Sequence, residues 1–379
     1  MLNLKVFIII LAFFIAYGTI DKPLRDGIKR NSDIEALCKD GQPVSKVNIT
    51  DFKINWPGDA TGSTHELAIN EKFIFVTGQN MDHIAKFDYN GKLIELYKMP
   101  SGSGPHGILF NKHGRLWVSL EFSGKVVRLD DTGKIQEEID VRMQVKGADR
   151  SINPAPHGIG LDADGETIWF TGKRTSTVGK INPDKSVQHF PLETLGALPI
   201  YLFRGPDGNM WGTELSGSNI LHVNGKGNVT EYPIPTTNSR PIAIIPEPDG
   251  QHMWFSEEAG VKIGKIDMNG RITEYQVPVL QKNDIVASLC FDREGNLWVQ
   301  VYVDMKNPKP EGYDYLIKFD KSITKVEGNE LKDLSFTIYT LPTRMSVLHR
   351  IEMDNEGNLW YTEMMTDKLG KVTLKSRCN

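Results

Sequence analysis

The segment LHRIEMDNEGNLWYTE, residues 348–363, contains a short apolar strand, a turn ending in Glu-Gly, and a second strand that begins near an aromatic residue. This order is typical of a β-hairpin. Copies of it recur along the chain, mostly 41 to 45 residues apart with two longer intervals. They begin near His65, Pro105, Pro156, Pro199, Pro241, Ala287 and Leu348. The seven repeats predict an all-β, seven-bladed β-propeller with four strands in each blade.

The ring is expected to close through the two ends of the repeat region. Residues 47–57 (VNITDFKINWP) match the fourth strand of the other repeats, although they precede the first hairpin. The last repeat ends near Thr373 after only three strands. We therefore expect the N-terminal strand to complete the seventh blade and to cover its outer edge. On this basis the propeller occupies residues 47–379.

The first 46 residues differ from the rest of the chain. Lys5 precedes an uncharged apolar run at residues 6–20, which is shorter than the ~20 residues that usually span a bilayer. A basic start, an apolar middle and the small residues Ala16 and Gly18 predict a secretory signal peptide over residues 1–18. The alternative is an uncleaved membrane anchor formed by residues 6–20. Residues 19–46 are interpreted as a polar linker, and the propeller as secreted or extracytoplasmic.

The net charge argues against a nucleic-acid-binding protein, and the cysteines and sequons allow predictions about covalent modification. The net charge is −4 in 379 residues with both signs interspersed, which gives no basic face for nucleic acid. Cys38 and Cys378 flank the repeats, and a ring would bring them close enough for a disulfide in an oxidising compartment. Cys290 lies in an apolar strand and is expected to be a buried thiol. The sequons at Asn48 and Asn228 predict glycosylation in a eukaryotic host.

Aromatic residues and turn carboxylates recur at fixed places in the repeats. Tryptophan begins the second strand in six repeats, at positions 117, 169, 211, 254, 298 and 360. Regular recurrence favours packing between blades over ligand stacking. Turns such as DADG, EPDG and DREG resemble calcium loops only superficially, because a hairpin turn needs no metal.

Long loops are expected to gather on one face of the ring. Each innermost strand begins at this face, called the mouth face below, and each second strand returns to it. Two insertions, residues 142–155 and 302–314, fall in loops of the mouth face, whereas a third, residues 326–335, falls on the opposite face. Long loops on one face of a rigid ring usually frame a binding site. We therefore expect a small-molecule or peptide-like ligand at the mouth face.

The positions that begin the innermost strands carry the candidate chemistry. In blade order they are His65, His106, His157, Ile200, Ile242, Ala287 and His349. Because blade seven adjoins blade one, the four histidines should form an arc at the mouth of the channel. The second strands end at or near Glu121, Glu214, Glu257 and Glu363. Imidazoles suit proton transfer near neutral pH, or zinc, copper and iron; the alternative is that each imidazole caps a backbone carbonyl.

The repeats resemble the virginiamycin B lyase (streptogramin lyase) family. The resemblance rests on the sequence PHGI, a turn ending in Gly, a second strand such as LWYTE, and later segments such as IGKID and VTEYPIP. The resemblance covers residues 47–374. Enzymes of that family open a cyclic depsipeptide antibiotic by eliminating the ester C–O bond, with magnesium. The resemblance implies that His349 is the general base and Glu363 a metal ligand. Two positions differ, because a second metal-binding glutamate falls on Val347 and a substrate-binding histidine falls on Ala287.

Three functions follow from these observations. The first is a secreted lyase-like enzyme that acts on a cyclic ester or lactone, with His349 as base and a divalent metal held by Glu363. The second is a non-catalytic propeller that binds a ligand or protein at its mouth face. The third is a metal centre built from the histidine arc. A monomer is expected in each case.

Overall fold

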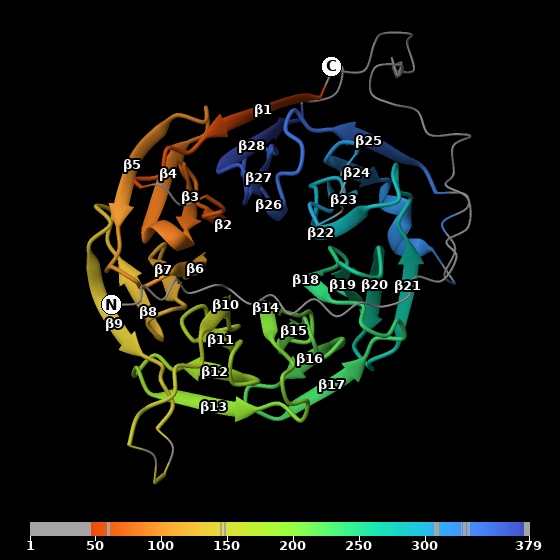
Figure 1. The fold of residues 1–379 in the computed structure, drawn as a ribbon. Helices are drawn as coiled ribbons and strands as arrows, with labels where there is room; N and C mark the ends of the chain where they lie inside the picture. Colours follow the sequence, from red (N-terminus) through yellow and green to blue (C-terminus); the bar gives the residue numbers. More distant parts are fainter. Residues whose placement is uncertain are drawn as a thin grey trace.

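The computed structural model describes residues 47–374, apart from 59–60, 145, 148, 307–310, 327, 329–330 and 332–333. These residues form seven four-stranded sheets arranged around a central channel (Figure 1). The predicted all-β, seven-bladed propeller is therefore confirmed. The predicted signal peptide or anchor, the linker and the Cys38–Cys378 disulfide lie outside the described residues and stay predictions. Within the described part of the chain, no helix is long and apolar enough to cross a membrane.

Each blade is an antiparallel meander whose first strand lines the channel and whose fourth strand forms the rim. Blade one contains β2 (Thr64–Ile69), β3 (Phe73–Gly78), η1 (Gln79–Met81), β4 (His83–Asp88) and β5 (Leu93–Lys98). Blade two contains β6 (Pro105–Phe110), β7 (Leu116–Leu120), β8 (Lys125–Leu129) and β9 (Ile135–Asp140). Blade three contains β10 (Pro156–Leu161), β11 (Ile168–Gly172), β12 (Thr177–Ile181) and β13 (Val187–Pro191).

The remaining four blades repeat this plan. Blade four contains β14 (Pro199–Arg204), β15 (Met210–Glu214), β16 (Asn219–Val223) and β17 (Val229–Pro233). Blade five contains β18 (Pro241–Pro246), β19 (His252–Glu257), β20 (Lys262–Asp267) and β21 (Ile272–Gln276). Blade six contains β22 (Asp284–Phe291), β23 (Leu297–Val303), β24 (Tyr315–Phe319), η2 (Lys321–Lys325) and β25 (Phe336–Thr340). Blade seven contains β26 (Leu348–Met353), β27 (Leu359–Glu363), β28 (Lys368–Thr373) and β1 (Asn48–Lys53).

The ring closes as the sequence predicts. Strand β1 lies antiparallel to β28, with Asn48 opposite Thr373. The Asp367 carboxylate then ties this blade to blade one, because it accepts hydrogen bonds from the backbone N–H groups of Ser63 (3.0 Å) and Thr64 (3.2 Å). The two ends of the repeat region therefore share one sheet, which covers the outer edge of blade seven.

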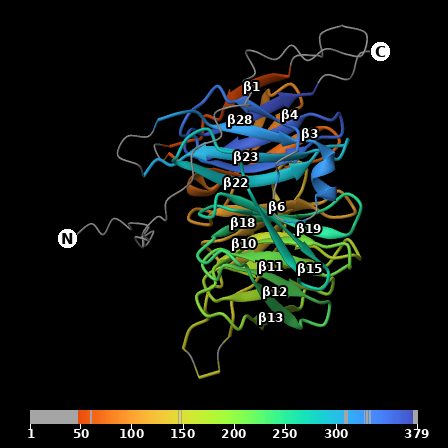
Figure 2. The same cartoon turned by 90° about the vertical axis from the view of Figure 1, so that its right-hand side faces the viewer.

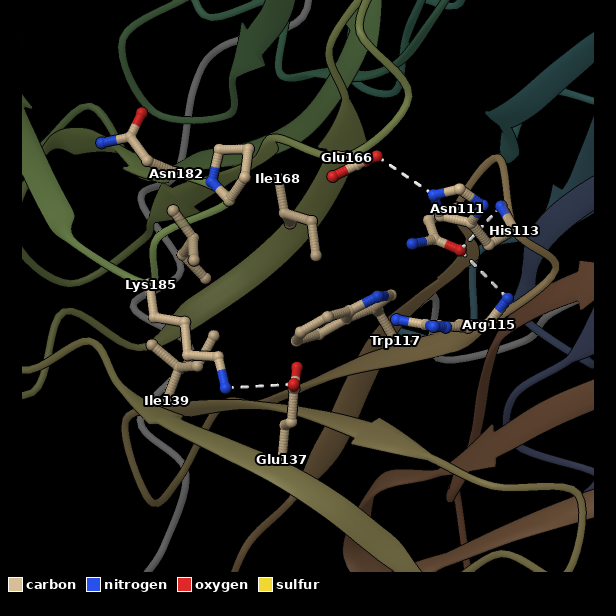
Figure 3. A pocket seen from close by; sticks show the side chains of 12 residues that line it. Asn111, His113, Arg115, Trp117, Glu137, Ile139, Glu166, Ile168, Asn182 and Lys185 are labelled. Atoms are coloured by element: carbon tan, nitrogen blue, oxygen red, sulfur yellow. Dashed lines mark hydrogen bonds and ion pairs between the residues drawn. The ribbon is translucent and has the colours of Figure 1, made fainter.

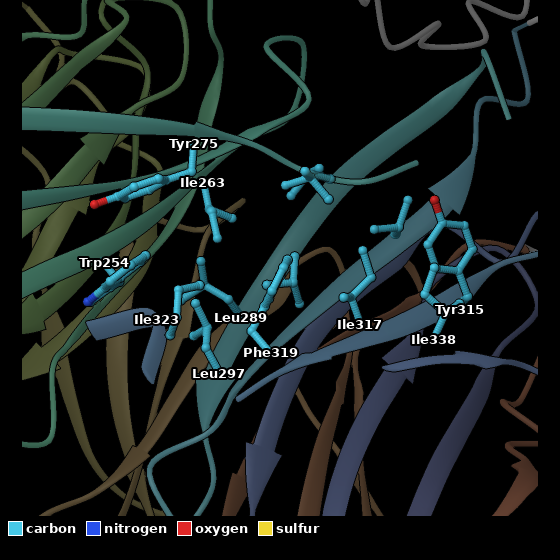
Figure 4. Packing of buried hydrophobic residues seen from close by; sticks show 14 of the residues in the cluster. Trp254, Ile263, Tyr275, Leu289, Leu297, Tyr315, Ile317, Phe319, Ile323 and Ile338 are labelled. Carbon is cyan, nitrogen blue, oxygen red and sulfur yellow. The ribbon is translucent and has the colours of Figure 1, made fainter. Parts of the chain in front are cut away.

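The tryptophans pack inside the ring and are not a ligand-stacking stripe. All six are buried, and Figure 4 shows Trp254 of blade five packing with Tyr275 near Leu289 and Leu297 of blade six. Most indole N–H groups donate to an acidic side chain of the preceding turn, as Trp360 does to Asp354 at 2.8 Å. Those carboxylates also accept backbone N–H groups of their own turn. The turns thus behave as hairpin turns, as expected.

Every innermost strand is interrupted by a β-bulge just after it begins. In β26, for example, the pairing shifts between Leu348 and Ile351, and the other six blades shift at the equivalent place. A bulge takes its residues out of the regular alternation of a strand and re-aims their side chains. The residues in the bulges include all four candidate histidines, so this local irregularity positions the site.

Figure 2 shows the loop after β9 and the helix η2 on opposite sides of the ring.

Candidate functional site

The four histidines converge, as the repeat positions predict. Between ring centroids, His65 lies 5.2 Å from His106 and 5.1 Å from His349, and His106 lies 5.6 Å from His349. His157 lies against His106, with ring centroids 3.6 Å apart. His106 is only 1% exposed, whereas the His349 side chain keeps 24% of its surface. His349 is therefore the imidazole most open to a ligand.

Two of the imidazoles are oriented by backbone carbonyls. His65 Nδ1 contacts the Ser63 carbonyl oxygen at 2.7 Å, and His157 Nδ1 contacts that of Ile200 at 2.9 Å. Because a carbonyl can only accept, the proton must sit on Nδ1, and the lone pair on Nε2. The carbonyl-capping alternative is thus correct for these contacts, yet it leaves the second nitrogen free. His106 Nδ1 is buried and has no partner among the described residues.

His349 is held by Glu66, which the sequence argument missed. Glu66 Oε1 lies 3.2 Å from His349 Nδ1, and Glu66 Oε2 lies 2.9 Å from Arg350 Nε. These are ion-pair contacts without the alignment of linear hydrogen bonds. A carboxylate beside Nδ1 favours the proton there and leaves the His349 lone pair on Nε2.

Glu66 and Arg350 occupy the second position of their bulges, where a charged residue is unusual in this ring. The equivalent residues in four other blades are Gly107, Gly158, Ala243 and Ser288. At Gly107 a Cβ atom would lie 2.5 Å from the His157 carbonyl oxygen, so glycine is required there. In blade four the equivalent residue is Tyr201. Opposite charges in adjacent blades, at a position that is uncharged in the other five, are a signal that the sequence contained.

Arg350 also reaches across the channel. Its guanidinium carbon lies 4.2 Å from the ring centroid of Tyr201, on β14 of blade four, and its Nε lies 3.2 Å from Glu352 Oε1. Blades seven and four stand on opposite sides of the ring (Figure 1). Because Arg350 follows His349 along β26, this cation–π contact forms a floor beneath the histidines. A ligand of His349 must therefore approach from the mouth face.

Burial and charge fix the protonation of the site. Burial lowers the pKa of His65 to about 3 and holds the pKa values of His106 and His157 well below their ordinary range. Burial alone would raise the pKa of Glu66, but Arg350 and His349 outweigh it and hold this pKa below its usual value. At neutral pH the site therefore combines the neutral imidazoles of His65, His106 and His157 with an ionised Glu66.

Glu121 joins the arc. Its Oε2 accepts a hydrogen bond from Gln79 Nε2 (2.6 Å) and lies 4.0 Å from His157 Nε2. Its Oε1 lies 3.2 Å from the ammonium of Lys173, a cation that the sequence argument did not single out. The candidate Glu121 is thus placed beside the histidines, together with a positive charge.

The other three candidate glutamates lie within their own blades. Glu214 Oε2 accepts from Asn219 Nδ2 (2.8 Å), Glu363 Oε2 accepts from Thr366 Oγ1 (2.6 Å), and Glu257 lies near Glu274. Burial raises the pKa of Glu214 and of Glu363 to about 7, and that of Glu257 to about 9. The groups of described residues that could hold a metal are His65, His106 and His349, and His106, Glu121 and His157.

The surroundings of Glu363 do not fit the magnesium site that the resemblance implies. Magnesium is usually held by carboxylates and water in an octahedron of oxygens. Here Val347 stands where a second carboxylate was expected, and the charge of Lys368 acts on Glu363. One Glu363 oxygen has no partner among the described residues, but the pKa of the Glu363 carboxyl group, about 7, marks a group that ionises with difficulty. No chemical step is therefore assigned to a metal on Glu363.

A separate hollow lies between blades two and three on the opposite face of the ring. Its lining includes Asn111, Glu137, Glu166 and Lys185, and none of the candidate site residues (Figure 3). Glu166 is already paired with Lys112 (2.7 Å) and His113 (3.0 Å). The histidine arc is thus the better candidate for a functional site.

Comparisons with known proteins point to one family. Residues 141–306 match the Virginiamycin B lyase family. A Virginiamycin B lyase of Nocardia farcinica (strain IFM 10152) is 31% identical over 117 residues, which is 31% of this chain and 36% of that protein, so the match spans about a third of the relative's length. A streptogramin B lyase structure superposes with a TM-score of 0.71 at 22% identity, over 87% of this chain and 98% of that one. A catalytically inactive histidine-to-alanine variant of the Staphylococcus aureus virginiamycin B lyase, with quinupristin, gives a TM-score of 0.62 at 22% identity, over 87% and 100%.

The chain is a virginiamycin B lyase-like propeller. At 22% identity, the solved structures support the fold of this lyase-like propeller and nothing finer. The similarity does not favour the alternative of a non-catalytic propeller.

Proposed function

We propose that the lyase-like propeller is a carbon–oxygen lyase that opens a cyclic ester or lactone, with His349 as the general base. The observation that carries the proposal is the orientation of His349. Its Nδ1 faces Glu66 at 3.2 Å, while its side chain remains the most exposed of the four histidines. An imidazole oriented through one nitrogen and open at the other is arranged for proton transfer.

The reaction is an elimination. His349 Nε2 takes the proton from the carbon next to the ester-bearing carbon, and the electrons of the C–H bond form a C=C bond. The C–O bond breaks at the same time, and the carboxylate leaves with its electron pair. Glu66 stabilises the imidazolium that forms, and the nearby ammonium of Lys173 attracts the negative charge that develops on the substrate.

The position of the site supports a ligand that enters from one side. The floor formed by Arg350 and Tyr201 lies beneath His349. The insertion at residues 142–155 borders the site, because Asn153 Nδ2 donates to the backbone carbonyls of Glu121 (3.1 Å) and Phe122 (2.9 Å). A ring-shaped substrate resting on the mouth face would place one ester bond at the arc while its remainder stays outside.

The test uses quinupristin, the compound named with one similar structure, together with simpler macrocyclic lactones. Elimination gives a ring-opened product of unchanged mass with a new C=C absorbance, whereas hydrolysis adds one water. His349→Ala should lower turnover on the order of a hundredfold or more, as expected for loss of a general base. The control is His113→Ala, an exposed histidine on the opposite face.

Three results would contradict the proposal. They are a product heavier by one water, turnover that survives in His349→Ala, and no conversion of any cyclic ester by the intact chain. Circular dichroism and thermal unfolding of both variants establish that a loss of turnover does not come from a loss of fold.

A further inference from the structure

We propose that His65, His106 and His349 form a three-histidine site for a transition metal such as zinc. The three imidazoles come from β2, β6 and β26, the innermost strands of blades one, two and seven. One nitrogen from each ring lies within 4.8 Å of the others. Imidazole nitrogen is a good ligand for zinc, copper and nickel but a poor one for magnesium. This site goes beyond the proposed elimination, in which no step is assigned to a metal.

The spacing of the rings fits a tetrahedral ion. With zinc–nitrogen distances of about 2.1 Å, three imidazoles on one tetrahedral zinc have ring centroids roughly 5 Å apart. The observed separations are 5.1, 5.2 and 5.6 Å, and the ring planes are inclined to each other by 58° to 73°. In such a site the ligating nitrogens lie roughly 3.4 Å apart. Here they lie within 4.8 Å of one another, so the rings must turn their nitrogens toward a common centre to bind the ion.

The second group of nearby ligands fits less well. His106 and His157 face each other with centroids 3.6 Å apart and planes inclined by 37°, which is closer to stacking than to joint coordination. Glu121 is already paired with the ammonium of Lys173 at 3.2 Å, and that charge would oppose a cation. The geometry therefore assigns the metal to His65, His106 and His349, with His157 packed behind.

The contacts of the remaining ring nitrogens support the same assignment. Metal-bound histidines usually donate their other N–H to a carbonyl or carboxylate. His65 has the Ser63 carbonyl at 2.7 Å, and His349 has Glu66 at 3.2 Å. His106 has a buried Nδ1 without a partner among the described residues. A buried nitrogen without a hydrogen bond is costly, and an ion bound at His106 Nδ1 itself would remove that cost.

The proposed ion would also limit catalysis. It would occupy His349 Nε2, the atom that takes the proton in the elimination, so metal binding and turnover should exclude each other. Three protein ligands leave a fourth tetrahedral position for water or a ligand donor, and His349, the most exposed ring, lies on the open side. Zinc would thus act as an inhibitor of the elimination.

The experiment titrates the metal-free full chain with Zn²⁺ by calorimetry and with Co²⁺ by visible absorption. We expect one ion per chain and the intense visible bands of tetrahedral cobalt. His65→Ala and His106→Ala should each weaken binding on the order of a hundredfold. Glu66→Gln keeps an acceptor near His349 but removes its charge, and should weaken binding roughly tenfold. His113→Ala, exposed on the opposite face, controls for adventitious binding.

Every outcome of this titration bears on the assignment. Binding that is lost in His157→Ala but kept in His65→Ala would place the ion at the other group and overturn the proposal. Binding equal in all variants, or octahedral cobalt, would overturn it as well. Neither readout needs a substrate, so the metal site can fail while the elimination stands, and the reverse. If both stand, Zn²⁺ should suppress turnover, and a chelator should restore it.

Discussion

The two sides of the channel mouth share one backbone and differ in chemistry. In blades seven, one, two and three the bulge of the innermost strand carries His349, His65, His106 and His157. In blades four, five and six the same place carries Ile200, Ile242 and Ala287. The repeated backbone thus places one residue of each blade at the channel mouth, and only blades seven, one, two and three carry a histidine there.

The glutamates also differ between blades, because they do not all occupy the same position at the end of the second strand. Glu214, Glu257 and Glu363 end their strands opposite Pro199, Pro241 and Leu348, and lie inside their blades. In blade two Leu120 takes that place opposite Pro105, and Glu121 follows one residue later. Glu121 thus lies in the turn after β7, and from there its carboxylate reaches the histidines, 4.0 Å from His157 Nε2.

The largest predicted effect is a loss of turnover on the histidine side of the channel mouth and not on the apolar side. His349→Ala removes the proposed base, so turnover of a cyclic ester should fall on the order of a hundredfold to ten-thousandfold. Ile242→Ala, at the equivalent bulge of blade five, should change turnover by less than about threefold because no proton is transferred there. The measurement is kcat/KM, followed by the disappearance of the intact cyclic ester. Comparable losses in the two variants would contradict a special role for the histidine side.

Much of this architecture could be read from the sequence. The repeat interval, the turn residues and the recurring tryptophan predict seven blades, and residues 47–57 predict the closing strand. The histidine arc followed from counting positions, because equivalent positions of a closed ring must meet at one face. These features depend on local sequence pattern and on the symmetry of the repeats, and both can be seen in the sequence.

The contacts between blades could not be predicted in the same way. Glu66 and Arg350 are far apart in the chain, and their pairing depends on bulges that no local pattern revealed. The sequence places both Glu363 and His349 at the mouth face, but His349 lies in the bulge, whereas Glu363 pairs with Leu348 before it and accepts a hydrogen bond from Thr366 of its own blade. A one-residue difference in register decides whether a carboxylate enters the site or stays in its blade.

The second prediction concerns the floor of the channel. Arg350→Met should destabilise the fold by about 2 to 4 kcal/mol, because it leaves the buried carboxylate of Glu66 without its partner. The double variant Arg350→Met with Glu66→Gln removes both charges and should recover most of the loss. Chemical unfolding monitored by tryptophan fluorescence measures both. An unchanged midpoint in the single variant would show that the pair adds little to stability.

The third prediction tests the carboxyl groups buried inside blades. The folded-state pKa of Glu257 is about 9, against an ordinary value of 4.5, because burial raises it. Between these two pH values the folded protein keeps a proton that the unfolded chain has released, so stability from this group falls as pH rises. Glu257→Gln removes this dependence and should raise the free energy of unfolding at pH 8 by on the order of 2 kcal/mol. The difference in the free energy of unfolding between pH 5 and pH 8 should be smaller in the variant than in the parent, and part of it should remain because Glu214 and Glu363 also titrate in this range.

The smallest effect is expected at Glu214, which occupies the same place in blade four. Burial raises its pKa only to about 7, because the hydrogen bond from Asn219 favours the charged form. Its proton is retained between pH 4.5 and about 7, so the loss of stability is complete near pH 7 and does not grow above it. Glu214→Gln should therefore gain about 1 kcal/mol at pH 8. A larger gain than in Glu257→Gln would contradict the order of the two pKa values, about 7 for Glu214 and about 9 for Glu257.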